Sequence, residues 1–230
     1  MIPHAAHRDA LAAQQAEFLA LARRAPPTAV VPGCPGWTAL DVVTHLTGVH
    51  RWAAALSRTP PGAAVPPDDD PAPADDPAAA YAAAAAALLV ALDEDPSRPC
   101  TTLTGAGTAG DWYRRQAHET LLHAWDLADA AGAPRTGSRA QVADAVEEVL
   151  DTLLPRQVRL GRTAALEVAV RLAGSRRWVL GSGPVVAEVA GPDAALLRLL
   201  WGRTPPTDPG LVVTGDRERA ADVLSAALTP

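Results

Sequence analysis

The chain contains no lysine, and all twenty of its basic residues are arginine. Acidic residues outnumber the arginines, which gives a formal net charge of −6 at pH 7. General nucleic-acid binders need a basic face to neutralise phosphates, so this charge argues against a nucleic-acid partner. The absence of lysine beside abundant alanine and proline is typical of GC-rich coding and says nothing about function.

Cysteine is almost as scarce, since Cys34 and Cys100 are the only two. Two cysteines are too few for a disulfide framework and fit a reducing compartment. The first ten residues lack the apolar core of a signal peptide. The longest apolar run, residues 78–92, is shorter than the roughly 20 residues of a membrane span. We therefore expect a soluble cytoplasmic protein with no membrane partner.

Aromatic residues make up only 4% of the 230 residues, although hydrophobic residues of all kinds reach 48%. Alanine, leucine and valine must therefore do most of the packing. The length allows one large domain or two small ones. Composition changes at the Gly- and Pro-containing stretch 132–138, which predicts two domains, residues 1–135 and residues 136–230.

The first domain is expected to be a four-helix bundle. Helix-favouring composition and apolar periodicity predict helices at 9–25, 38–58, 77–93 and 109–131. Thr38 and Asp41 form a variant of the capping box, which marks the start of the second helix. The Pro- and Asp-rich segment 59–76 is expected to be a loop. Helices of these lengths favour an up-down bundle.

The second domain is expected to be a small α+β unit. Ser138 can cap a helix over about 139–154. Alternating apolar residues between turn signals predict further strands and helices. The strands are expected at 165–172, 176–180, 185–189 and 211–214, and the helices at 193–201 and 217–228.

The fourth predicted helix contains His118-Glu119-Thr-Leu-Leu-His123, which is one residue longer than the HExxH motif of zinc proteases. His118 and His123 point about 140° apart on a helix, so they cannot bind one metal from the same face. Glu119 and His123 are about 40° apart and can share a metal. Asp126 lies on the same stripe and is placed to orient His123.

A metal site needs a third ligand, and the second helix offers both His45 and His50. Their positions around the helix favour His45 only slightly. A different interpretation needs no metal. Glu119 would then form an i,i+4 ion pair with Arg115 on the surface, and His123 would be a hydrogen-bonded core histidine.

Two groups of segments resemble the signatures of a known family. The first comprises Val31-Pro-Gly-Cys-Pro-Gly-Trp-Thr38, Asp41-Val-Val-Thr-His45-Leu and Gly48-Val-His-Arg-Trp52. The second is Arg114-Arg-Gln-Ala-His-Glu-Thr-Leu-Leu-His-Ala-Trp-Asp126. They resemble the mycothiol-dependent maleylpyruvate isomerase family, within the DinB-like group of four-helix metalloproteins. The stretch Leu197-Arg-Leu-Leu-Trp-Gly-Arg203 resembles the small C-terminal domain of that family.

The resemblance implies zinc, or another divalent metal, held by His45, Glu119 and His123. Three protein ligands leave an open position for water or for the thiol of mycothiol. A thiol bound to zinc loses its proton and becomes a strong nucleophile at neutral pH. The resemblance also implies that Arg203 holds a substrate carboxylate; the alternative is a surface arginine at a helix end.

Three further residues are candidates for the surroundings of the site. Trp52 and Trp112 stand seven residues from His45 and Glu119, so both are expected to line the pocket where cofactor and thiol bind, with core packing as the alternative. Cys34 is expected to be structural.

The expected function is therefore zinc-dependent activation of a thiol. The reaction is either cis–trans isomerisation of a maleylpyruvate-like acid or S-transfer to an electrophile. Its partners would be the small-molecule substrate and the thiol, and the protein would be a monomer or a homodimer. Two alternatives remain open: catalysis by metal-bound water or a Lewis acid without thiol, and a non-catalytic metal-binding or stress-response protein.

Overall fold

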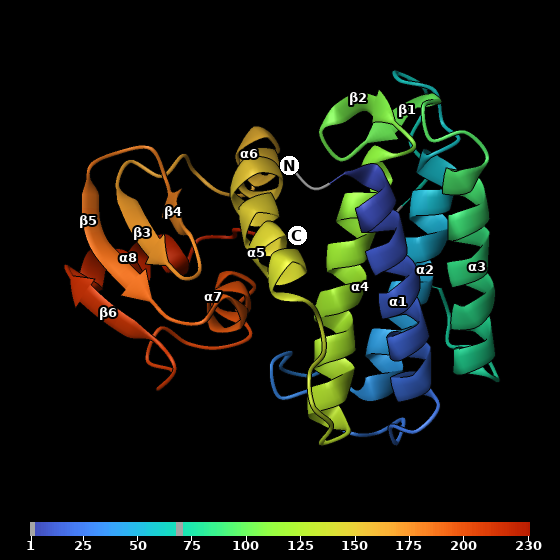
Figure 1. The fold of residues 1–230 in the computed structure, drawn as a ribbon, viewed down its shortest axis with the longest axis horizontal. Helices are drawn as coiled ribbons and strands as arrows, with labels where there is room; N and C mark the ends of the chain where they lie inside the picture. Colours follow the sequence, from blue (N-terminus) through green and yellow to red (C-terminus); the bar gives the residue numbers. More distant parts are fainter. Residues whose placement is uncertain (1–2, 68–70) are drawn as a thin grey trace. The chain divides into compact units, whose positions relative to one another are not determined.

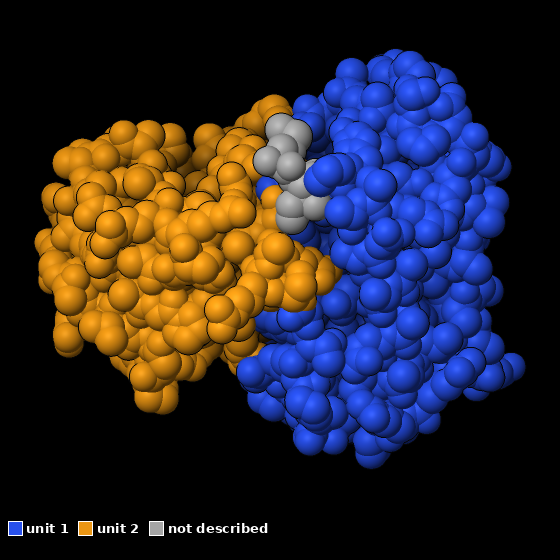
Figure 2. Space-filling model, in the orientation of Figure 1, with its two compact units in different colours: residues 1–137 blue, residues 138–230 orange. Residues whose placement is uncertain are grey.

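The computed structural model describes residues 3–67 and 71–230. The chain, drawn as a ribbon in Figure 1, divides into two compact units, residues 1–137 and residues 138–230, which Figure 2 shows in different colours. The division falls two residues after the boundary expected from the composition. Among the described residues, no helix combines the length and the apolar character needed to span a membrane.

The first unit is built on four long helices, as the sequence predicts. They are α1 (His4–Ala22), α2 (Ala39–Leu56), α3 (Pro77–Asp93) and α4 (Asp111–Ala130). Helix α1 packs against α4, α2 packs against α3, and α2 also contacts α4 (Figure 1). The contact between α2 and α4 matters most for function, because these two helices carry the candidate metal ligands.

The helix directions follow from contacts at one end of the bundle. Arg58 and Glu94 form an ion pair of 2.9 Å just beyond the C-terminal ends of α2 and α3. Arg8, near the start of α1, pairs with Asp93 at the end of α3 at 2.7 Å. Helices α2 and α3 therefore run parallel to each other and opposite to α1. This differs from strict up-down alternation, because the long connection after Ser57 returns the chain to the end where α2 begins.

The start of α2 is fixed by the predicted capping box. The Thr38 side chain accepts a hydrogen bond from the backbone of Asp41, and the Asp41 carboxylate accepts one from the Thr38 backbone at 2.8 Å. Two backbone donors at the helix end are thereby satisfied. The apolar stripe of Val42, Leu46 and Ala53 is fully buried, which sets the face that α2 turns toward the bundle.

A β-hairpin between α3 and α4 was not predicted. Strands β1 (Pro99–Thr102) and β2 (Gly105–Thr108) pair antiparallel. They consist mostly of threonine and glycine and lack an alternation of apolar residues, so they give little strand signal. Trp112, on the first turn of α4, donates from its indole to the Thr101 carbonyl at 3.1 Å and attaches the hairpin to the helix.

The second unit is the small α+β unit that the sequence predicts. Its four-stranded mixed sheet has the order β4–β3–β5–β6, with β3 and β5 parallel and the other neighbours antiparallel. The strands are β3 (Ala169–Ala173), β4 (Arg177–Leu180), β5 (Val185–Ala190) and β6 (Val212–Gly215). The helices are α5 (Arg139–Glu148), α6 (Leu154–Arg159), α7 (Asp193–Leu200) and α8 (Arg217–Leu224).

Helices α5 and α6 are joined by a π-helical turn, η1 (Val149–Leu153), where the sequence predicts one continuous helix to residue 154. Pro155 stands two residues after the end of this turn and has no amide hydrogen to donate into the helix. A wider turn before the proline accommodates the missing hydrogen bond.

Candidate metal centre

Three of the predicted site residues converge inside the bundle. His45 comes from α2, and Glu119 and His123 come from α4. Glu119 Oε1 lies 3.2 Å from His123 Nε2 and 3.8 Å from His45 Nε2. One ligand atom from each side chain lies within 4.8 Å of the others. Two imidazole nitrogens and a carboxylate oxygen are donors that zinc uses in proteins, so these residues fit a divalent metal.

Asp126 fixes the orientation of one of these histidines. Its Oδ2 lies 3.0 Å from His123 Nδ1, and both residues are buried. The Asp126 carboxylate therefore pairs with Nδ1, and Nε2 faces Glu119. Metal-binding histidines commonly use their second nitrogen in this way, which sets the tautomer and the ring orientation.

The charged groups of the centre shift each other's proton affinities. Burial opposes the carboxylate form of Glu119. The charge of Arg115, a hydrogen bond from His123 and the nearby His45 outweigh it and hold the Glu119 pKa well below its usual range. Burial also opposes the charged form of His123. Hydrogen bonds to Asp126 and Glu119 outweigh it and raise the His123 pKa to about 9. The metal-free centre thus keeps its carboxylate ionised.

The ion pair between Arg115 and Glu119, considered above as the alternative to metal binding, is present. It is buried and not on the surface, with side-chain exposures of 8% and 11%. Arg115 donates to Oε2, whereas Oε1 faces the two histidines. The ion pair and the convergence with the histidines therefore use different oxygens of one carboxylate and are compatible.

His50, the competing third ligand, belongs to a separate buried network. Its Nδ1 lies 2.9 Å from Gln116 Oε1, and its Nε2 lies 3.4 Å from both Tyr81 Oη and Gln15 Nε2. Burial lowers the pKa of His50 to about 4, so the ring is neutral at pH 7. The network joins all four helices of the bundle and occupies both ring nitrogens of His50.

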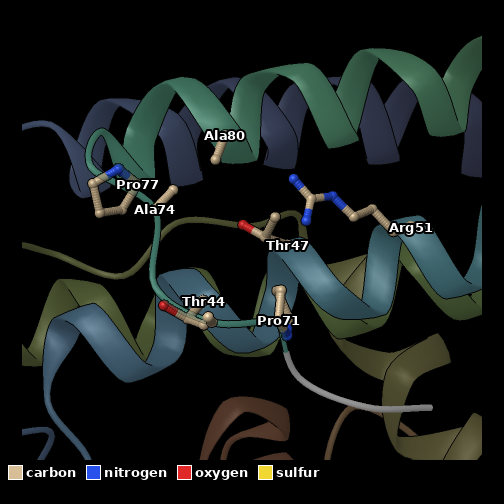
Figure 3. Close-up of a pocket in the computed structure, with 8 residues that line it drawn as sticks. Thr44, Thr47, Arg51, Pro71, Ala74, Pro77 and Ala80 are labelled. Carbon is tan, nitrogen blue, oxygen red and sulfur yellow. The ribbon is translucent and has the colours of Figure 1, made fainter. Parts of the chain in front are cut away.

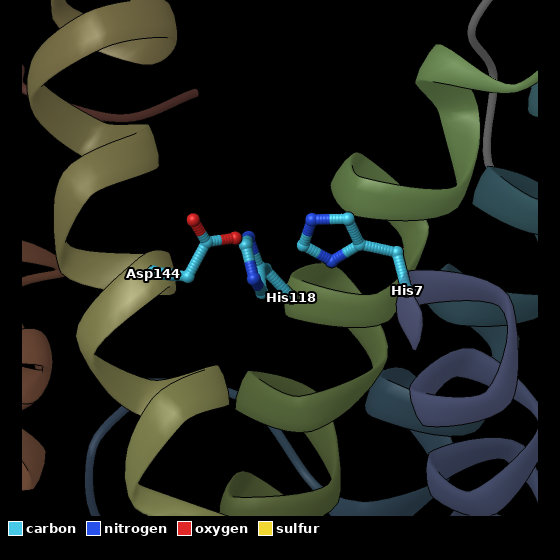
Figure 4. Close-up of side chains that lie close together, drawn as sticks. All are labelled: His7, His118 and Asp144. Carbon is cyan, nitrogen blue, oxygen red and sulfur yellow. The ribbon is translucent and has the colours of Figure 1, made fainter. Parts of the chain in front are cut away.

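His118 is separated from the converging ligands, as its position on the helix predicts. Its ring contacts that of His7 from α1 edge to face, with centroids 5.7 Å apart (Figure 4). The histidine that precedes Glu119 in the sequence therefore packs toward α1, while His123 faces α2.

Trp37 is a residue of this centre that the sequence reasoning did not select. Its ring lies edge to face on His45 at 5.2 Å between centroids and parallel to His123 at 6.4 Å. The turn before α2 holds it, because the Trp37 carbonyl accepts from Val31 N and its amide donates to the Cys34 carbonyl, both at 3.0 Å. The sequence could have indicated this role, because an aromatic residue directly before a helix cap packs back on the first turns of that helix.

The two tryptophans expected to line the pocket contact each other. Trp52 and Trp112 pack edge to face with centroids 5.7 Å apart. They lie seven residues from His45 and Glu119, which is about 10 Å along each helix. Trp112 is 2% exposed and belongs to a core cluster, so the packing alternative accounts for its position. A role for the pair in lining a pocket remains a prediction.

Arg203 lies in the second unit, directly after α7. Gly202 adopts a left-handed conformation with φ of 67°, and the Arg203 amide donates to the Arg198 carbonyl at 2.8 Å. This is the hydrogen bonding by which a glycine commonly ends a helix. The guanidinium carbon lies 5.8 Å from the centre of the Trp201 ring, and Nη1 donates to the Trp201 carbonyl at 3.1 Å.

A small pocket lies between α2, α3 and the segment that precedes α3 (Figure 3). Its lining residues are Thr44, Thr47, Arg51, Pro71, Ala72, Ala74, Pro77 and Ala80. Within the described residues this lining contains no histidine, cysteine or carboxylate, so it provides no ligands for a metal.

Fold and site together define a class: a four-helix bundle with a candidate two-histidine, one-carboxylate metal centre, joined to a small mixed α+β unit. Residues 8–128 match the family model described as the mycothiol maleylpyruvate isomerase N-terminal domain, and residues 140–222 match the MDMPI C-terminal domain. The chain therefore belongs to the mycothiol-dependent maleylpyruvate isomerase family, a family of enzymes. The family resemblance of the sequence is confirmed.

Solved structures agree with this assignment. The crystal structure of the mycothiol-dependent maleylpyruvate isomerase has a TM-score of 0.70 and 16% identity, and each chain is covered to 93%. A histidine-to-alanine mutant of that isomerase has a TM-score of 0.71 and 15% identity, again with 93% of each chain covered. At these identities the likeness establishes the fold. No curated protein sequence matches the chain.

Proposed function

We propose that the protein is a zinc-dependent enzyme that activates a low-molecular-weight thiol, mycothiol, and applies it to a small electrophilic acid. Family membership supports the thiol as cosubstrate. The observation that carries the metal is the convergence of His45 Nε2, Glu119 Oε1 and His123 Nε2 inside the bundle. Three ligands of this kind are the set that catalytic zinc sites use, with one position left open.

Zinc in this centre would lower the pKa of a thiol at the open position, so that the thiol is a nucleophile near neutral pH. The protein's own residues do the remaining work. Asp126 orients His123 through Nδ1. The Glu119 carboxylate supplies the negative charge that a buried divalent cation requires. The Trp37 ring packs edge to face on His45 and thereby restricts the orientation of that ring.

The proposed isomerisation conserves atoms and electrons without an oxidant. The thiolate sulfur adds to one carbon of a cis double bond conjugated to a carbonyl, and the electron pair moves onto the carbonyl oxygen. The carbon–carbon bond is now single and rotates. The electron pair then returns, the carbon–sulfur bond breaks, and the trans product and the thiolate are released. In S-transfer the carbon–sulfur bond remains and the adduct takes up a proton.

Substrate binding is assigned to Arg203. A guanidinium can bind a carboxylate with two parallel hydrogen bonds, which suits an acid such as maleylpyruvate. The family likeness of the C-terminal unit supports this assignment.

The test uses the purified full-length protein with and without bound zinc. Elemental analysis measures zinc, calorimetry measures mycothiol binding, and an assay with a maleylpyruvate-like acid is run with and without the thiol. We expect zinc, thiol binding that is lost after chelation, and turnover only with thiol present. Turnover without any thiol would instead support metal-bound water or Lewis-acid catalysis. Protein with neither zinc nor thiol binding would contradict the proposal.

A further inference from the structure

We infer that Arg115 is a positioning residue that holds one oxygen of Glu119 so that the other alone faces the two histidines. This inference rests on the proposed metal site. Arg115 Nη2 donates to Glu119 Oε2, and Oε1 is the atom nearest to His123 Nε2 and His45 Nε2. The two oxygens of one carboxylate therefore have different partners.

The spacing and the burial of Arg115 and Glu119 favour a stable ion pair. Arg115 and Glu119 are four residues apart on α4, the spacing at which two side chains meet on one helix face. Their side chains are only 8% and 11% exposed, so water is poorly placed to replace either partner. An arginine bonded to a carboxylate in a buried position gives directional hydrogen bonds as well as charge. Rotation of the Glu119 carboxylate is thereby restricted.

The restriction matters because a carboxylate can bind a metal through one oxygen or through both. With Oε2 held by Arg115, Glu119 offers Oε1 only, and the protein supplies three donor atoms. If Glu119 were free to turn, its second oxygen would compete for the position that the thiol needs. Arg115 thus keeps the coordination position for the thiol open.

Simple electrostatics predicts a different outcome. A positive charge close to a bound cation weakens the binding of that cation, so removal of Arg115 would tighten metal binding by charge alone. Metal affinity by itself is therefore a poor readout of positioning. The number of donor atoms around the metal separates the two effects.

The experiment replaces zinc with Co²⁺ in the full-length protein, because four-coordinate Co²⁺ absorbs visible light more strongly than Co²⁺ with five or six ligands. Arg115→Met removes the charge and the donors while keeping a long side chain. Arg115→Gln is the second variant, in case the methionine form does not fold. Arg114→Met is the matched control, since it removes the same charge from the neighbouring residue of α4. Circular dichroism verifies the fold of each variant.

We expect strong visible absorption in the unmodified protein and in Arg114→Met, and weaker absorption in both Arg115 variants. Thiol binding to the Arg115 variants should weaken by about tenfold or more, as for other losses of a residue that orients a metal ligand. Unchanged absorption and thiol binding in a folded Arg115 variant would overturn this inference but leave the proposed function standing. Unmodified protein that binds Co²⁺ with weak absorption would also overturn it. Unmodified protein that binds no metal would contradict the proposed function and this inference together.

Discussion

Asp126 Oδ2 lies 3.0 Å from His123 Nδ1, and the two side chains are 1% and 3% exposed. A buried carboxylate at this distance fixes the orientation of the imidazole ring and accepts a hydrogen bond from its Nδ1. The other nitrogen, Nε2, is left facing Glu119 Oε1 at 3.2 Å. The contact with Asp126 therefore orients the His123 ring so that Nε2 faces the candidate metal centre.

Replacement of Asp126 tests this relationship. Asp126→Asn should weaken zinc affinity by about 10- to 100-fold, because the histidine loses an anionic partner that orients it and raises its basicity. Competition with a chromophoric chelator measures the affinity. Asp129→Asn is the matched control, since Asp129 lies about one turn further along α4 and pairs with Arg135. Equal affinities of the two variants would show that Asp126 does not support the metal.

His50 should make the protein sensitive to mild acid. Burial lowers its pKa to about 4, below the 6.5 of an exposed histidine. Its contribution to stability is complete above pH 6.5 and is lost as the pH falls toward 4, because the unfolded chain takes up the proton first. The difference corresponds to about 3 kcal/mol in the free energy of unfolding.

Urea unfolding of the metal-free protein at several pH values between 7 and 4 measures this loss. Carboxylates also titrate in this window, so the readout is the comparison with His50→Gln, which cannot gain a proton. The glutamine variant should lose less stability between pH 6.5 and 4 than the unmodified protein. The same pH dependence in both proteins would show that His50 does not carry the effect.

The first unit should fold and bind metal by itself. All three candidate ligands precede Gly137, where the first compact unit ends. We therefore expect a chain of residues 1–137 to give a helical circular dichroism spectrum and to bind about one zinc ion. An unfolded, metal-free fragment would show that the bundle core depends on the second unit.

Arg203 should act on the substrate and not on the metal. Arg203→Lys keeps the positive charge but loses the planar fork that binds a carboxylate with two hydrogen bonds. We expect weaker catalysis with a maleylpyruvate-like acid and unchanged zinc content. Steady-state kinetics and elemental analysis of the variant decide the matter. Unchanged kinetics in Arg203→Ala would remove Arg203 from the site.

The sequence predicted the features that depend on local geometry. The capping box at Thr38 fixed the start of α2, and helix periodicity separated His118 from Glu119 and His123. The β1–β2 hairpin escaped detection because threonine and glycine without apolar alternation give no strand periodicity. The parallel course of α2 and α3 depends on the long connection between them, whose path helix patterns do not specify.

Helix geometry alone could not decide between His45 and His50, and it was the family resemblance that implied His45. The two histidines lie at similar angles from the exposed face of α2, and only the packing of α2 against α4 distinguishes them. His45 lies beside Glu119, whereas His50 pairs with Gln116. Likewise, the Arg115 ion pair and the metal site were competing interpretations in the sequence, because the spacing does not reveal that each uses a different oxygen of Glu119.

The most direct test of the proposed metal centre is the zinc content of five proteins, measured by elemental analysis after purification under identical conditions. The unmodified protein and His118→Ala should each contain about one zinc per chain, because His118 packs against His7. His45→Ala, Glu119→Ala and His123→Ala should each lose most of it, because each removes one of the three converging donors. Loss of zinc from His118→Ala with full retention in Glu119→Ala would contradict the proposed centre.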